Sequence, residues 1–208
     1  MKLTKIITGV IRENCYILSK NGYALIIDPG DEAEKIIDKI TELDVYPVSI
    51  LLTHAHFDHI GALDAISGKY EIPVYIHDLE EDALLDPQLN LSSITDKPFT
   101  TNPADKIIYS EGPYSIGPFN FDIKHTPGHS VGSISFIFND EKVVISGDVL
   151  FRESIGRTDL DGGDHSALFN SIHEKLMVLD DDFQVLPGHG MSTTIGHERQ
   201  SNPFLKNI

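Results

Sequence analysis

The residues with the clearest chemistry lie in one short stretch of the sequence. The segment "LLTHAHFDHIGAL", residues 51–63, contains three histidines and an aspartate within six positions, namely His54, His56, Asp58 and His59. Burying imidazole or carboxylate is costly unless each group finds a partner. His54 and His56 are two residues apart, so in extended backbone their side chains lie on the same face. Together these side chains predict a metal-binding cluster at the end of an apolar strand.

Three later segments repeat this arrangement, in which an apolar strand ends beside a glycine and a residue able to bind a metal. They are "FDIKHTPGHSVG", "KVVISGDVLF" and "FQVLPGHG". Strand ends present side chains to a cleft, and glycine allows a tight turn there. The predicted metal ligands are therefore His54, His56, Asp58, His59, His129, Asp148 and His189.

The number and type of these ligands indicate more than one metal ion. Seven ligands exceed the four of a closed structural zinc site. They suit two divalent ions that share one carboxylate and each keep an open position for water. Imidazole and carboxylate bind zinc, iron and manganese, so the ligand types alone do not select the metal. We expect two divalent ions, zinc in the first place, with iron or manganese as alternatives.

Other polar residues receive structural predictions. We expect Asp28, in "IIDPG", to support the turn beside the site through hydrogen bonds, and Asp164 to cap the helix that follows it. Cys15 is expected to pack in the core. The remaining histidines are predicted to lie outside the ligand set, although His125, four residues before His129, could support a ligand.

The ligand segments must be positioned by the elements around them. Runs of β-branched and aromatic residues predict strands at 3–8, 15–19, 23–28, 48–52, 73–77, 106–110, 119–126, 133–138, 142–148 and 183–188. Helices are predicted at 31–43, 62–70, 78–85 and 166–176, and the segment 193–205 is expected to begin as a helix. Residues 86–104 are predicted to form a polar loop. Adjacent strands with occasional helices favour two sheets packed together with helices outside.

Composition restricts the expected partners and location. The chain has 208 residues, 40% of them hydrophobic, and no linker divides it, so we expect a single domain over 1–208. A net charge of −16 without a basic cluster argues against nucleic acid as a partner. No apolar stretch reaches the roughly 20 residues that span a bilayer, so no membrane association is expected. One cysteine and the absence of a signal-peptide pattern favour the cytoplasm, and the oligomeric state stays open.

The motif H-x-H-x-D-H at 54–59, followed in order by "TPGHS", "SGD" and "PGHG", resembles the metallo-β-lactamase superfamily. The resemblance extends over nearly the whole chain and is greatest to the short, single-domain form of the glyoxalase II group. It implies an α+β fold, the four-layer αββα sandwich, with the site on one rim. It also implies one metal bound by His54, His56 and His129, a second bound by Asp58, His59 and His189, and Asp148 as the bridge.

The same resemblance implies a reaction, the hydrolysis of a thioester of the S-lactoylglutathione type. Two metal ions supply a bridging hydroxide at neutral pH and polarise the carbonyl group that it attacks. Asp58 is the predicted catalytic residue, because its carboxylate could orient the hydroxide or take its proton. Arg157 aligns with a substrate-binding lysine of glutathione-using relatives, so it either contacts substrate or forms an ion pair that stabilises its loop. The expected partner is a small-molecule thioester whose carrier thiol stays open.

Several other activities use a similar ligand set. A mononuclear iron persulfide dioxygenase shares much of the motif, and a lactonase would open cyclic esters with the same residues. A zinc β-lactamase is disfavoured, because those enzymes usually have cysteine where Asp148 stands and this chain shows no export signal. A nuclease is disfavoured because nucleases of the superfamily carry large inserted domains and this chain is strongly acidic. A metal-binding protein without catalysis is the remaining alternative.

Overall fold

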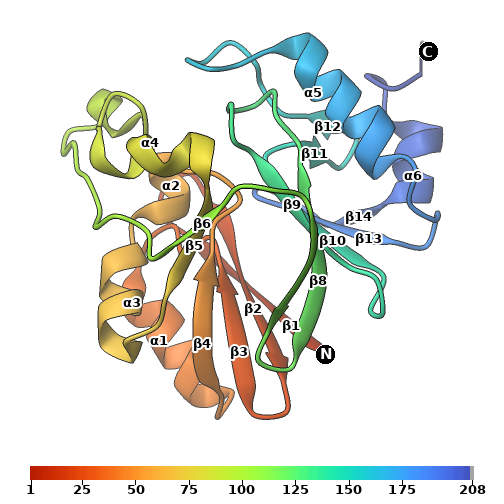
Figure 1. Ribbon diagram of the computed structural model, residues 1–208. Coiled ribbons are helices and arrows are strands. Elements are labelled where there is room, and N and C mark those ends of the chain that lie inside the picture. Colours follow the sequence, from red (N-terminus) through yellow and green to blue (C-terminus); the bar gives the residue numbers. More distant parts are fainter. Residues whose placement is uncertain (207–208) are drawn as a thin grey trace. The chain divides into compact units, whose positions relative to one another are not determined.

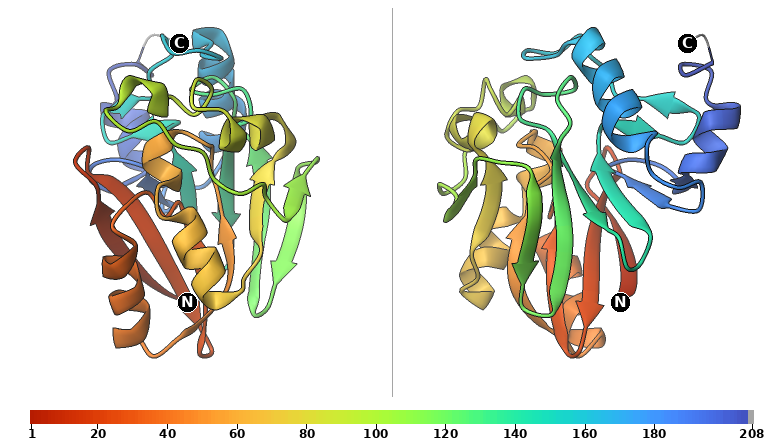
Figure 2. Two further views of the ribbon diagram at one scale, coloured as in Figure 1. Left: turned by 90° about the vertical axis from the view of Figure 1, so that its left-hand side faces the viewer. Right: turned by 45° about the vertical axis from the view of Figure 1, so that its right-hand side comes forward.

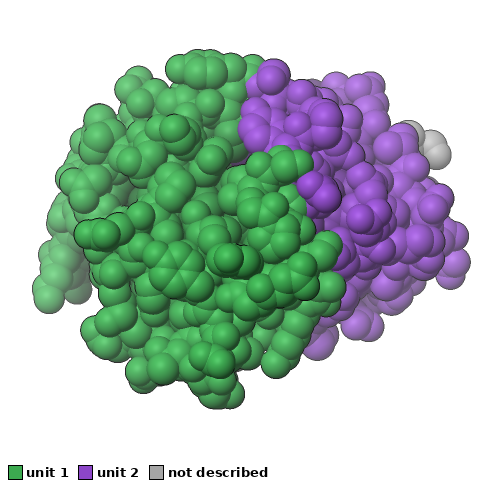
Figure 3. Space-filling view, turned by 60° about the horizontal axis from the view of Figure 1, so that its bottom comes forward, with its two compact units in different colours: residues 1–109, 115–119 green, residues 110–114, 120–208 purple. Residues whose placement is uncertain are grey.

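The computed structural model describes residues 1–206, which divide into two compact units. Figure 3 colours unit 1, residues 1–109 and 115–119, separately from unit 2, which comprises residues 110–114 and continues from residue 120. Each unit contains a six-stranded sheet. The single domain predicted over residues 1–208 stays a prediction.

The sheet of unit 1 has the strand order β1-β2-β3-β4-β5-β6 (Figure 1). Its strands are β1 (Lys2–Thr8), β2 (Glu13–Lys20), β3 (Tyr23–Ile27), β4 (Tyr46–Leu51), β5 (Val74–His77) and β6 (Lys106–Ile108). The first three strands pair antiparallel, and β3 to β6 pair parallel. Ile27 at the end of β3 pairs with Leu51 at the end of β4. This register brings the residues that follow β3 beside the histidine-rich segment that follows β4.

Helices α1 and α3 lie side by side on the sheet of unit 1 (Figures 1 and 2). The helical elements of this unit are α1 (Ala33–Glu42), α2 (Phe57–Ile60), α3 (Leu63–Tyr70) and α4 (Glu81–Leu85), with 3₁₀ turns η1 (Asp78–Glu80) and η2 (Ser92–Ile94). Helix α1 buries Ile36, Ile37 and Ile40, the spacing expected for an amphipathic helix. These side chains join a core that also contains Cys15, as predicted for that cysteine.

The sheet of unit 2 has the order β14-β13-β10-β9-β8-β7. Its strands are β7 (Gly112–Ile116), β8 (Phe119–His125), β9 (Ile134–Phe138), β10 (Val143–Gly147), β13 (Gln184–Pro187) and β14 (Thr193–Thr194). A separate two-stranded ribbon contains β11 (Leu150–Phe151) and β12 (Ser154–Ile155). Strands β10 and β13 are parallel neighbours, so the ligand-bearing segments that follow them leave the sheet at the same edge. Strands β7, β11, β12 and β14 were not predicted, because each is short or lacks a strong apolar pattern.

The helices of unit 2 differ in one respect from the prediction. Helix α5 (His165–Ser171) ends five residues before the expected boundary and continues as a π-helical turn, η3 (Ile172–Leu176). The predicted helical start within 193–205 is α6 (Ile195–Ser201). Asp164 caps α5 as predicted, because its Oδ1 accepts a hydrogen bond from the amide of Ala167 at 2.9 Å. Across the described residues, helices long and apolar enough to cross a membrane are absent.

Candidate metal centre

The histidines of unit 1 lie together where β4 gives way to α2. The ring centroids of His54 and His56 are 4.6 Å apart, and those of His54 and His59 are 4.1 Å apart. All three imidazoles are buried. The adjacent Asp58 places its Oδ2 3.7 Å from Nε2 of His59 and is itself largely buried. The structure therefore brings together the four ligand-type residues that the sequence predicts in this unit.

Asp28 organises this cluster from the end of β3. Its Oδ1 accepts a hydrogen bond from the amide of Thr53 at 2.7 Å, and its Oδ2 accepts one from the Thr53 hydroxyl at 2.7 Å. The same Oδ2 accepts from Nδ1 of His59 at 3.1 Å. Since the Thr53 hydroxyl donates to Asp28, its oxygen is available to accept from Nδ1 of His54, 3.0 Å away. The prediction that Asp28 supports the turn is confirmed.

These hydrogen bonds decide which nitrogen of each ring can bind a metal. A hydrogen on Nδ1 of His54 and of His59 leaves the lone pair on Nε2. Histidine ligands of metal sites commonly donate their other ring nitrogen in this way, which fixes the ring and makes it a better ligand. His54 and His59 can therefore each bind a first-row divalent cation through Nε2.

Two buried glutamates support the cluster, and the sequence-based ligand set did not include them. Glu80, in η1, accepts a hydrogen bond from the amide of Ala55 at 2.9 Å and so fixes the backbone between two ligands. Glu13, at the start of β2, accepts from the Thr8 hydroxyl at 2.6 Å, and burial raises its pKa well above the ordinary value. A charged residue opening the otherwise apolar segment "ENCYILS" was the available signal for Glu13.

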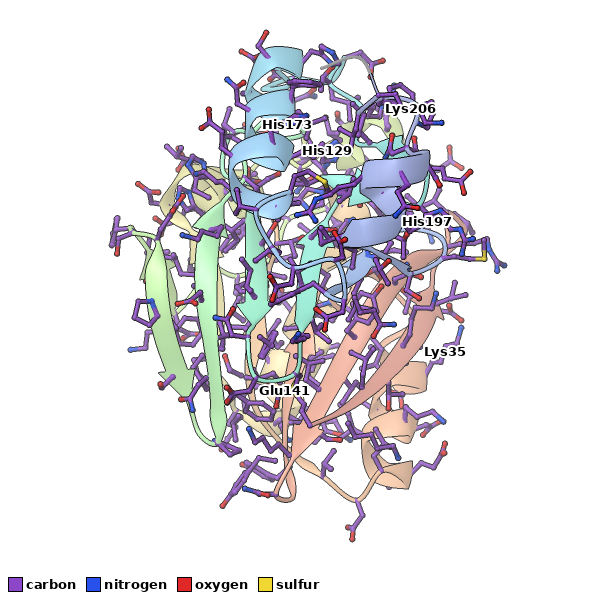
Figure 4. The ribbon with its side chains drawn as sticks, turned by 90° about the vertical axis from the view of Figure 1, so that its right-hand side faces the viewer. Lys35, His129, Glu141, His173, His197 and Lys206 are labelled. Carbon is purple, nitrogen blue, oxygen red and sulfur yellow. The ribbon has the colours of Figure 1, made fainter. Side chains whose placement is uncertain are left out.

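The predicted ligands of unit 2 also lie together. Oδ2 of Asp148, after β10, is 3.5 Å from Nε2 of His129 and 3.5 Å from Nε2 of His189. His129, labelled in Figure 4, follows β8, and its Nδ1 donates to the carbonyl of Arg157 at 2.9 Å. One carboxylate thus lies between two imidazoles, and the better-buried imidazole has its Nε2 lone pair directed toward that carboxylate. This is the position expected for a ligand shared by two cations.

Glycine is required where the chain carries His129. Gly128 has a φ of +130°, which other residues rarely adopt. A Cβ at this position would lie 2.1 Å from the backbone nitrogen of Leu168 in α5. The helix and the ligand loop can therefore approach this closely only because residue 128 has no side chain.

Arg157 forms an ion pair within its own loop. Its Nε and a terminal nitrogen each donate to a carboxylate oxygen of Asp159, both at 2.8 Å. The pair lies in solvent, and the guanidinium lowers the pKa of Asp159 to about 2. The loop-stabilising role is thus visible in the structure, and the backbone of Arg157 also holds His129. Contact of Arg157 with substrate stays a prediction.

The other histidines have different surroundings. Nε2 of His125 donates to the carbonyl of Val131 at 2.9 Å, so this residue braces the loop that follows β8. His77 lies 3.0 Å from Asp78, and His197 lies 2.9 Å from Glu153. Each of these three side chains thus contacts a neighbouring loop or helix end, and the exclusion of the remaining histidines from the ligand set stays a prediction.

The fold and the two ligand clusters define the class of protein. The family model of the metallo-beta-lactamase superfamily matches residues 8–189, so the chain belongs to this superfamily. The predicted α+β metallo-β-lactamase fold is confirmed. Superfamily membership and the histidine–aspartate clusters identify the chain as a metal-dependent hydrolase.

Within the superfamily, the chain is similar in sequence to individual relatives over nearly its whole length. The chain is 48% identical over 206 residues to the "Probable metallo-hydrolase YqgX" of Bacillus subtilis, covering 99% of this chain and 98% of that one. It is 39% identical over 219 residues to the "Hydroxyacylglutathione hydrolase GloC" of Haemophilus influenzae, with 99% and 98% covered.

Two solved structures show the same similarity in three dimensions. A structure described as BLEG-1 B3 metallo-beta-lactamase has a TM-score of 0.97 and 49% identity, covering 99% of this chain and 100% of that chain. A structure of TTHA1623 in a di-iron-bound form has a TM-score of 0.81 and 38% identity, covering 97% and 100%.

Proposed function

We propose that this protein hydrolyses thioesters with two bound divalent metal ions, zinc in the first place. Following the superfamily pattern, His54, His56 and His129 would hold one ion and Asp58, His59 and His189 the other, with Asp148 shared between them. The observation that carries the metal proposal is the hydrogen bonding of Nδ1 in His54, His59 and His129, which leaves the lone pair of Nε2 to bind the metal. The choice of a thioester as the substrate rests on the similarity to a hydroxyacylglutathione hydrolase.

Bound metal ions supply an activated water at neutral pH and polarise the carbonyl group that it attacks. The chain's own residues then position and move protons. Asp58 accepts the proton of the attacking water through its carboxylate and passes it to the departing thiolate or to solvent. A thiolate is a good leaving group, so no dedicated general acid is required. Asp28 and Glu80 keep the ligand loop in place during the reaction.

An assay of metal-analysed protein on a panel of thioesters tests this proposal, with oxygen consumption recorded in parallel. We expect thioester turnover without oxygen uptake. Oxygen-dependent turnover of a persulfide by protein with one iron per chain would replace the proposal with the dioxygenase. Hydrolysis of lactones alone would replace it with a lactonase.

A second candidate function is the hydrolysis of β-lactams. It is favoured by the similarity to a structure described as a B3 metallo-beta-lactamase, at 49% identity and a TM-score of 0.97. A β-lactam amide also opens by attack of water at a carbonyl, so the same ligands suit it. The discriminating measurement is the ratio of kcat/KM for a penicillin to that for a thioester on one metal-loaded sample. A ratio well above one would identify β-lactams rather than thioesters as the preferred substrates.

The metal content provides a further prediction. Purified protein saturated with zinc is expected to bind about two ions per chain, because the predicted ligands exceed the capacity of one open site. Elemental analysis after removal of loosely bound metal measures this ratio. A value that never exceeds one would contradict the dinuclear proposal and favour a mononuclear centre.

The role of Arg157 can be separated from that of its ion pair. If Arg157 contacts an anionic substrate, Arg157→Ala lowers kcat/KM for that substrate about three- to tenfold, a moderate loss because the guanidinium is exposed to solvent. Asp159→Ala frees the guanidinium and is expected to raise the same value. A neutral thioester and the metal content serve as controls and are expected to change little. Equal losses on both substrates in both variants would assign Arg157 to the loop alone.

A further inference from the structure

We propose that a cavity in unit 1 receives the acyl group of the substrate and favours acyl groups that are apolar and longer than acetyl, an inference that rests on the proposed thioester hydrolysis. The cavity has a volume of about 320 Å³ and lies among the β1–β2 turn, the first turn of α2 and the segment 97–99. Asp58 lines it as well, so the cavity adjoins a predicted catalytic residue. Two larger hollows in this unit, of about 620 and 550 Å³, are lined mainly by polar and charged residues and include no predicted ligand.

One wall of the cavity is the tip of the β1–β2 turn. Val10 is 95% exposed and Ile11 is 46% exposed, an arrangement that leaves aliphatic surface in water. The base of the turn is nevertheless held in place. The amide of Gly9 donates to Glu32 at 3.0 Å, and Nζ of Lys35 donates to the carbonyl of Ile7 at 2.7 Å. The turn therefore presents its apolar tip in a defined position, where a bound acyl group would cover it.

Two aromatic residues, Phe57 and Phe99, also line the cavity, and hydrogen bonds hold their backbones in place. The carbonyl of Asn90 accepts a hydrogen bond from the amide of Phe57 at 2.8 Å, and its side-chain amide donates to the carbonyl of Phe99 at 3.0 Å. Ser92 adds two hydrogen bonds to the backbone of Phe99, one donated at 2.9 Å and one accepted at 3.0 Å. Buried Asn90 thus holds both aromatic residues in one arrangement, which a specificity pocket requires.

Two glycines that line the cavity, Gly30 and Gly61, lie against closely packed backbone. A Cβ on Gly30 would lie 1.9 Å from the carbonyl oxygen of Asp58, and a Cβ on Gly61 would lie 2.4 Å from the carbonyl oxygen of Gly30. Neither position accepts a side chain, so this part of the lining beside Asp58 is restricted to glycine.

The lining indicates which arm of the thioester enters. Peptide-like thiols carry amides and carboxylates, which form hydrogen bonds to water. If such a thiol entered the cavity, these groups would lose those hydrogen bonds, and aliphatic and aromatic side chains could not replace them. An alkyl or aryl acyl group has no such groups to satisfy. Lys97 also lines the cavity, and the long stem of a lysine side chain is apolar. Asp31, another lining residue, uses its Oδ1 to accept a hydrogen bond from the amide of Glu32 at 2.6 Å. The apolar acyl arm is therefore the better occupant.

The test uses N-acetylcysteamine thioesters, whose small neutral thiol is constant while the acyl group is acetyl, butanoyl or hexanoyl. A fully buried methylene is worth about a fourfold change in binding. The cavity is open to solvent, so we expect kcat/KM of the metal-loaded protein to rise by about tenfold or more from acetyl to hexanoyl. Val10→Ser, alone and with Ile11→Ser, is expected to remove about three- to tenfold of the hexanoyl value and to lower the acetyl value less, because acetyl covers less of the apolar turn. Val178→Ser is the matched control, because Val178 is 68% exposed and lies outside the lining.

Two results in this series would overturn the inference. A flat acyl series would show that the cavity is not used by the acyl group. Equal losses across the series in Val10→Ser would place the thiol arm there instead. A binding measurement separates these failures from failure of the proposed function. Hexanamide, which keeps the acyl group without the thiol, is expected to shift the methyl NMR signals of Val10 and Ile11 even if no thioester is hydrolysed, and unshifted signals would reject the acyl site.

Discussion

Asp148→Asn is expected to lower turnover by more than about a hundredfold while the protein remains folded. In unit 2 the Asp148 carboxylate lies 3.5 Å from Nε2 of both His129 and His189, so it is placed to neutralise cations that those imidazoles bind. Asparagine keeps the size of the side chain and removes its charge. Loss of residues that only support metal ligands costs about ten- to a hundredfold, and a shared ligand should cost more. Steady-state kinetics with elemental analysis measure the effect.

Asp164→Asn is the matched control for this variant. Asp164 lies in the same unit and binds only backbone as the cap of α5, a role that asparagine fills equally well. We expect normal turnover and metal content in the control, and thermal unfolding transitions within a few degrees of the parent in both variants. Near-normal hydrolysis by Asp148→Asn with two ions bound would show that Asp148 is not a shared ligand.

Asp28→Asn is expected to weaken metal binding by about ten- to a hundredfold. The Asp28 carboxylate accepts three hydrogen bonds, from the amide and hydroxyl of Thr53 and from His59. Asparagine retains one acceptor oxygen and turns an amide donor toward groups that must donate. The hydrogen on Nδ1 of His59 then loses its acceptor, and the ring loses its fixed orientation. Titration against a competing chelator measures the affinity.

Asp28 acts through the histidines, so excess metal should restore most of the activity of Asp28→Asn. A residue that took part in the chemical step would not be rescued in this way. Asp105→Asn is the control in unit 1, because Asp105 accepts a hydrogen bond from the amide of Val74 and asparagine keeps that acceptor. Unchanged metal affinity in Asp28→Asn would mean that the remaining contacts, Thr53 with His54 and Glu80 with Ala55, suffice to orient the ligand loop.

The two substrate proposals are complementary. The cavity beside Asp58 concerns the acyl arm, and Arg157 concerns a negative charge elsewhere on the substrate. The strong overall charge of −16 gives no long-range attraction for an anionic thioester, so local cations and apolar contacts must provide the affinity. Measuring kcat/KM while the acyl length and the charge of the carrier thiol are varied independently therefore shows which arm of the substrate determines specificity.

The sequence by itself identified the ligand-type residues and most elements that carry them. This was possible because the signals are local. His54, His56, Asp58 and His59 are neighbours in the chain, and each later ligand follows an apolar strand beside a glycine. The Ile36–Ile40 spacing defined α1, and the Asp164 cap defined the start of α5, since both depend on residues within one or two helical turns.

The tertiary structure decided how the ligands are held. Asp28 reaches Thr53 and His59 because β3 and β4 pair in parallel, and Glu80 reaches Ala55 across 25 residues. Neither contact could be predicted from the spacing of its residues in the sequence. The ion pair between Arg157 and Asp159 is likewise visible only in the structure, and contact of Arg157 with substrate stays a prediction. Hydrogen bonds between distant segments depend on strand register and loop path, and these emerge only when the whole chain has packed.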